Sequence, residues 1–172
     1  MRNRDHPDHR TSIAFRAVNT RGEAGYDPGV QRHHLLPCQL LSERCFGPMF
    51  AALGRDRAGF DDFRRNGLLL PANEQASLHT GMPLHRGPHR RYNEVVIARV
   101  GSIEANWAAT RPRDHEAALA VALLRLHLLQ GALRRQLLAE RRRVVLNRKD
   151  PLGTDHDFSE LDAMAETLWA AK

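Results

Sequence analysis

The sequence predicts an α+β protein that is mostly helical, in which two short strands precede long helices. Short apolar runs bounded by Gly or Pro, within residues 31–37 and 68–70, are typical of short strands. From about residue 88 onward, apolar residues recur at helical spacing. The chain has 172 residues, of which 42% are hydrophobic, which is enough for one domain with a helical appendage.

The composition narrows the classes of function. A formal charge of +6 and a pI near 10.3 favour a polyanionic partner such as nucleic acid, although an Arg-rich composition alone would also produce them. The two cysteines form no CxxC pair, which excludes a four-cysteine zinc site and a disulfide framework. We find no Sec signal, and the longest apolar run, Ala117–Leu124, is too short to span a bilayer. A cytoplasmic location without a membrane partner is therefore expected, with export by a non-Sec route as the alternative.

The N-terminal arm, residues 1–30, is polar and rich in turn-forming Gly and Pro, so we expect it to be mostly irregular. Within it, only Ile13–Val18 has the composition of a short strand. The next segment carries His33 and His34 ahead of Pro37. Proline favours an extended residue before it and ends regular pairing, so a short strand or an extended turn should carry the two histidines.

The middle of the chain is expected to alternate short helices with one strand and one loop. In chain order we expect a helix at 38–54 split by Gly47-Pro48, a short helix at 60–65, a buried strand at 68–70 and a loop at 72–84. Gly54 fits the end of the first helix, and Asn66-Gly67 would form the turn before the strand.

Long helices are predicted for the second half of the chain. One should run from about residue 88 to 107, and Asp114 is the expected N-cap of a leucine-rich helix reaching about Val145. A last short helix is expected at Ser159–Ala171. The apolar seam of the leucine-rich helix predicts a buried face within one chain, with a homodimer interface as the alternative.

Four histidines stand in two pairs: His33 and His34 are adjacent, and His85 and His89 are spaced i, i+4. Imidazoles bind transition-type metal ions, and a histidine with a near-neutral pKa can act as a general base. If the following helix begins near His85, then His85 and His89 share a helical face and can bind one ion together. If the helix begins later, His85 lies on a loop and the turn between the two histidines decides whether they meet. Both geometries stay open.

Three segments in this order resemble the AHH nucleases of the HNH/endonuclease VII superfamily, also called His-Me finger nucleases. They read His-His-Leu-Leu-Pro, Asn-Gly-Leu-Leu-Leu-Pro and His-Arg-Gly-Pro-His-Arg-Arg-Tyr-Asn, and the similarity spans about residues 31–107. The resemblance implies a small ββα-metal core at 31–110, with a C-terminal helical extension at 111–172. It also implies an endonuclease that hydrolyses phosphodiester bonds, of DNA more than of RNA, with the aid of one divalent ion (Mg, Mn, Ni or Zn).

The resemblance implies roles for individual residues. His34 matches the general base, and Asn66 matches the asparagine that orients it. The implied metal ligands are His33, His85 and His89. The candidates for phosphate contacts are four neighbouring arginines, Arg32, Arg86, Arg90 and Arg91. Two further residues, Tyr92 and His79, are candidates for a second shell around the metal ligands.

Two other hypotheses about function stand beside that of a nuclease. Many AHH proteins are expected to be bacterial toxin modules, so the resemblance raises a toxin or defence role with an immunity protein as partner. The alternative is a metal-binding module without catalysis, which recognises nucleic acid or protein and dimerises through its leucine-rich helix. Arg32 stands where the family usually has a small residue, and the arginines also fit a solvated helix face.

Overall fold

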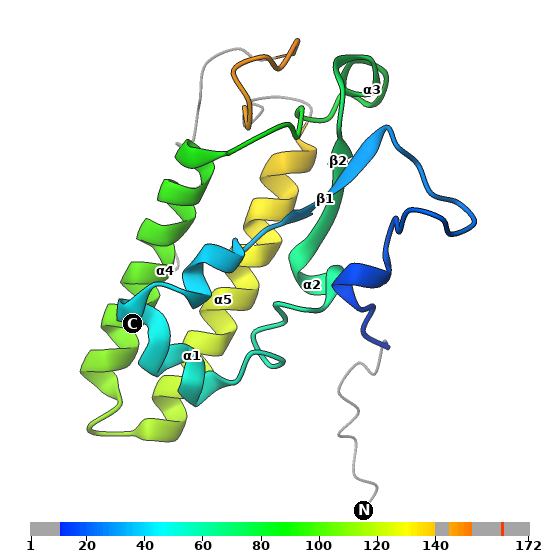
Figure 1. Cartoon of the computed structure of the whole chain (residues 1–172). Coiled ribbons are helices and arrows are strands. Elements are labelled where there is room, and N and C mark those ends of the chain that lie inside the picture. The colour runs from blue at the N-terminus through cyan, green and yellow to red at the C-terminus, as the bar shows by residue number, and fades with distance from the viewer. Residues whose placement is uncertain (1–10, 140–144, 153–162, 164–172) are drawn as a thin grey trace, which may run out of the picture.

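The computed structural model of this chain describes residues 11–139, 145–152 and 163. The helix expected at Ser159–Ala171 lies outside these residues, apart from Ala163. The described part is mostly helical, with one antiparallel pair of strands followed by helices (Figure 1). This arrangement confirms the predicted α+β fold and fits a ββα core with C-terminal helices.

In Figure 1 the two long helices lie side by side, and the strand pair lies to one side of them. The elements in chain order are η1 (Phe15–Ala17), β1 (Val30–His34), η2 (Cys38–Leu41), η3 (Arg44–Phe46), α1 (Gly47–Leu53), α2 (Phe63–Asn66), β2 (Gly67–Pro71), α3 (Glu74–Thr80), α4 (Arg90–Thr110) and α5 (His115–Leu138).

Strand β1 pairs with β2 in a register that puts His33 opposite Leu68 and His34 opposite Gly67. Gly67 has extended backbone, so it is not a turn residue. A Cβ at this position would overlap the ring of Phe63, which is why only glycine fits here. Asn66 ends α2, and the expected Asn66-Gly67 turn is therefore a direct passage from helix to strand.

One hydrophobic core joins the region of the strand pair to both long helices. The buried face of α4 includes Val96, Val100 and Ile103, and that of α5 includes Leu126 and Leu133. The side chain of Asp114 accepts a hydrogen bond from Ala117 N at 2.9 Å, which confirms the expected N-cap of α5. Helix α5 ends at Leu138 rather than near Val145, because Ala139 adopts an extended conformation.

Helix α5 is long and apolar enough to cross a membrane by length and composition, with a mean hydropathy of 1.4 over its most apolar window. We expected no segment to span a membrane because that expectation considered only the length of uninterrupted apolar runs, not the mean hydropathy of a whole helix. In the structure, the buried face of α5 packs on α4 and includes Gln130 and Gln136. Polar side chains on this face indicate contacts with protein, because an amide facing lipid would lack hydrogen-bond partners.

Three expected elements differ in the structure. The loop expected at 72–84 contains α3, whose N-cap Asn73 accepts from Ala76 N at 2.8 Å and whose end is set by Gly81 at φ 68°. Gly47-Pro48 begins α1 rather than interrupting a helix, because the first turn does not need the N–H that proline lacks. In place of a strand at Ile13–Val18 there is the short helix η1, preceded by a single bridge to the segment before α2.

Candidate active site

His33 is the buried member of the histidine cluster. It lies on β1 with 3% of its surface exposed. Its ring centroid is 4.9 Å from that of His85, 5.3 Å from that of His89 and 4.9 Å from that of Tyr92. The strand pair thus presents His33 toward the loop that precedes α4 and toward the first turn of that helix.

His85 and His89 precede α4 rather than lying on it. Helix α4 begins at Arg90, and His89 is its N-cap residue with non-helical backbone. The main-chain N of His85 donates to Pro71 O at 2.7 Å, which ties the loop to the end of β2. Gly87, at φ 80°, turns the chain between the two histidines. The helical i, i+4 geometry is therefore wrong, and the loop geometry is the one found.

His33, His85 and His89 form what we call the histidine triad. One ring nitrogen from each lies within 4.8 Å of the others. His33 Nε2 and His89 Nδ1 are buried and have no hydrogen-bond partner among the residues that the structure describes. An unpaired buried polar atom costs about 1–3 kcal/mol, and a bound cation would remove that cost. Three imidazoles leave open coordination positions, as a catalytic metal site requires, and they suit a transition-type ion better than Ca²⁺ or Mg²⁺.

Burial is the largest cause lowering the pKa of all three triad imidazoles. The pKa of His33 lies well below its usual value, and the charges of His85 and His89 add to the effect of burial. The pKa of His85 falls to about 4. The imidazoles are therefore neutral near pH 7, which is the form that binds a metal ion.

Acidification is expected to destabilise the metal-free protein between pH 6.5 and about 4. Over this window the unfolded chain binds a proton at His85 that the folded chain does not, so the free energy of unfolding falls as the pH falls. Urea denaturation in EDTA at several pH values measures the effect. The dependence should be shallower in His85→Gln and unchanged in the control His79→Gln, which alters an exposed histidine on α3. Equal dependence in all three proteins would contradict this account.

His34 follows on β1 but lies outside the triad. Consecutive strand residues point to opposite faces, and the ring of His34 stacks on Phe15 with centroids 3.6 Å apart. Burial lowers the pKa of His34; the Asp61 carboxylate acts against this, and nearby arginines lower the pKa further. Within the described part of the chain, no hydrogen bond occupies its ring nitrogens. A neutral imidazole with a free ring nitrogen is the form that accepts a proton.

Asn66 is fully buried immediately before β2. Its Oδ1 accepts from Leu36 N at 2.7 Å, and its Nδ2 donates to Leu36 O at 3.1 Å. Its main-chain O accepts from Leu35 N at 2.9 Å. These bonds hold the two residues that follow His34, so Asn66 fixes the end of the strand that carries the histidine pair.

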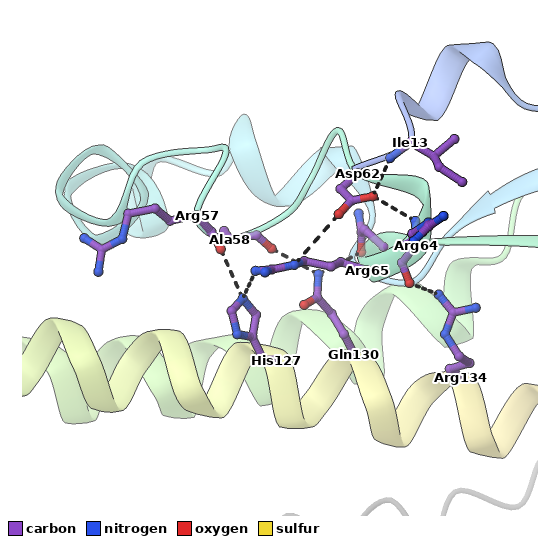
Figure 2. Close-up of polar contacts among 10 residues, drawn as sticks. Ile13, Arg57, Ala58, Asp62, Arg64, Arg65, His127, Gln130 and Arg134 are labelled. Atoms are coloured by element: carbon purple, nitrogen blue, oxygen red, sulfur yellow. Dashed lines mark hydrogen bonds and ion pairs between the residues drawn. The ribbon is translucent and has the colours of Figure 1, made fainter. Parts of the chain in front are cut away.

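Gln130 of α5 completes the bonding of Asn66, and sequence reasoning did not single it out as a site residue. Its Nε2 donates to Asn66 Oδ1 at 3.3 Å and to Ala58 O at 3.1 Å. Figure 2 shows Gln130 between His127 and Arg134, which contact main-chain oxygens of the segment that precedes β2. A polar residue in the apolar seam of a leucine-rich helix was the signal available in the sequence.

Tyr92 supports the same strand end from α4. Its hydroxyl donates to Leu35 O at 2.8 Å, and its ring meets that of His33 edge to face. Burial raises the pKa of Tyr92, so the phenol stays protonated and acts as a hydrogen-bond donor. The side chain therefore orients the buried ring of His33 without titrating.

The other candidate residues differ in the hydrogen bonding and the exposure of their side chains. Nη1 of Arg32 donates to two main-chain oxygens of the N-terminal segment, at 2.7 and 3.1 Å, and so ties that segment to β1. Arg86, Arg90 and Arg91 are exposed at the start of α4. His79 is exposed on α3 and is not part of the triad.

Three imidazoles that converge between a strand pair and the start of a helix could hold a metal ion, with a donor set of the kind that hydrolytic enzymes use. Residues 14–126 match the model of AHH, a nuclease family of the HNH/ENDO VII superfamily with conserved AHH. The chain belongs to this family, and its motif reads Arg32-His33-His34. No curated protein and no solved structure matches the chain. Membership implies nuclease activity on nucleic acid.

Proposed function

We propose that this protein is a metal-dependent endonuclease that cleaves phosphodiester bonds of duplex DNA. The observation that carries the proposal is the convergence of three ring nitrogens within 4.8 Å, at a site in a nuclease family. His33, His85 and His89 would hold one divalent ion. When bound, such an ion stabilises negative charge on the scissile phosphate and on the leaving oxygen.

In this proposal His34 takes the proton from the attacking water. Three features support the assignment: its place beside the triad, its lowered pKa, and ring nitrogens that make no hydrogen bond to any residue that the structure describes. Asn66 and Tyr92 position His33 and His34 indirectly. Their side chains bond to the main chain of the two residues that follow this histidine pair. The exposed Arg86 is a candidate phosphate contact beside the ligands.

Three finer assignments are also proposals: the biological role, the location and the oligomeric state. We infer a toxin or defence role and action in the cytoplasm, with an immunity protein as partner where the role is toxic. We also infer a homodimer through the exposed face of α5, which carries Val121, Leu124 and Leu128. Growth of expressing cells tests the toxic role, and the mass of the purified protein in solution tests the dimer.

The central experiment is cleavage of supercoiled plasmid by the full chain, titrated with Mg²⁺, Mn²⁺, Ni²⁺ or Zn²⁺, with RNA as a parallel substrate. We expect nicked and linear products with at least one ion and none in EDTA. The variant His89→Ala should lose cleavage, whereas His79→Ala should keep it because His79 lies outside the triad. Metal and DNA binding without cleavage by any ion would replace the proposal with a non-catalytic binding module.

A further inference from the structure

A basic groove lies between the start of α4 and a segment that comes after α5. One wall is formed by Pro88, Arg90, Arg91 and Glu94, and the other by residues 146–149. The second wall lies beyond residue 126, where the match to the nuclease family ends. We call residues 145–152 the C-terminal strap; it is drawn in orange in Figure 1.

The strap is fixed to the loop that carries His85. The side-chain amide of Asn147 donates to Arg86 O, and the carboxylate of Asp150 accepts from Leu84 N at 2.8 Å. These bonds fall on the two chain neighbours of His85. Val145 and Leu146 are buried, which adds apolar contacts to the polar ones. The strap is therefore part of the surroundings of the metal ligands.

Among the residues that the structure describes, the lining of the groove carries an excess of positive charge. Its cations are Arg90, Arg91, Arg148 and Lys149, all exposed, against the single carboxylate of Glu94. Within residues 11–139 and 145–152, these four cationic side chains have no hydrogen bond or ion pair. The start of α4 lacks a side-chain cap, so its free N–H groups and helix dipole add to the positive potential.

The groove also lies next to the chain segment that carries His89 of the triad. Pro88 and Arg90, the chain neighbours of His89 on either side, both line it. A polyanion bound along the groove would therefore lie against the strap and against both chain neighbours of His89.

We propose that this groove binds the phosphodiester backbone of the DNA next to the scissile bond, and that Arg148 and Lys149 of the strap each contact a phosphate. The inference rests on the proposed nuclease function for its substrate. It assigns substrate binding to a part of the chain outside the matched family region. Each phosphate contact releases condensed counterions, which makes the affinity for duplex DNA depend on salt with a slope of about −0.9 per contact.

The test is binding of the full chain to a short fluorescein-labelled DNA duplex, followed by fluorescence anisotropy in EDTA over a range of KCl concentrations. The double variant Arg148→Gln/Lys149→Gln should bind about tenfold more weakly at moderate salt, and its plot of log K against log salt should be shallower by about 2. Arg57→Gln/Arg113→Gln makes the same charge change at exposed positions outside the groove, and it should change the slope by less than half as much.

Equal slopes in the strap variant and the control variant would overturn the proposal. An unchanged Ni²⁺ affinity by calorimetry is the check that the strap variant keeps its triad, because neither substituted side chain is a triad member. Binding in EDTA does not depend on cleavage, so the two proposals fail separately. If the strap variant binds DNA more weakly but the wild type cleaves no plasmid with any ion, the groove proposal stands and the nuclease function is rejected. If the wild type cleaves plasmid but the strap variant binds DNA normally, the nuclease function stands and the groove proposal is rejected.

Discussion

The variant His34→Ala is expected to cleave plasmid about 10²–10⁴-fold more slowly than the wild type, which is the usual contribution of a general base. The expected loss is in kcat, because in the proposed mechanism His34 acts on water rather than holding the substrate. The pKa of His34 is lowered by burial, so the acidic limb of the wild-type profile of kcat/KM against pH should lie below pH 6.5. Rates of plasmid nicking at saturating metal measure both effects.

The control for this prediction is the affinity for Ni²⁺, measured by calorimetry. His34 lies outside the triad, so His34→Ala should bind the ion as the wild type does, whereas His33→Ala should not. This contrast separates a base from a ligand in two adjacent residues of one strand. A His34→Ala protein with full activity would remove His34 from the mechanism, and one with lost metal binding would make it a ligand.

The two strands, and the grouping of the site histidines into two pairs, could be predicted from the sequence because both depend on local patterns. The run Leu68–Leu70 is short, apolar and bounded by Gly67 and Pro71, which is a strand signal whatever surrounds it. Asp114 was readable as an N-cap for the same reason, since a cap bonds to a residue three positions away. Spacing alone could also group His85 with His89, although not the backbone that joins them.

The starting point of α4 could not be read from the spacing of its apolar residues. His85 is held by a bond to Pro71 at the end of β2, so the strand, rather than local helix preference, decides where that loop runs. Gln130 and Asp150 were missed for a related reason. Each bonds to a partner more than sixty residues away, and even the polar position of Gln130 in an apolar seam does not identify that partner. The α3 helix could have been predicted from local residues, because Asn73 is an N-cap signal and Gly81 a helix-end signal.

The variant Asn66→Ala is expected to lose about 3 kcal/mol of unfolding free energy or more. Its side chain bonds both the N–H and the C=O of Leu36, and both groups are buried. Removing the amide leaves those groups unpaired, at about 1–3 kcal/mol each. Gln130 would lose one of its two acceptors as well. Urea denaturation of the metal-free protein, at a pH above the window in which His85 titrates, measures the change.

A matched control is Asn73→Ala, which removes the exposed N-cap of α3 and should cost about 1 kcal/mol. The two substitutions delete the same atoms, so the difference reports the buried setting of Asn66. Asn66→Ala should also weaken Ni²⁺ binding while it is still folded, because the strand end that carries His33 loses its anchor at Leu36. Asn73→Ala should leave the Ni²⁺ affinity unchanged. If the two variants lost equal stability and bound Ni²⁺ equally well, Asn66 would be an ordinary helix end rather than the residue that positions the histidine pair.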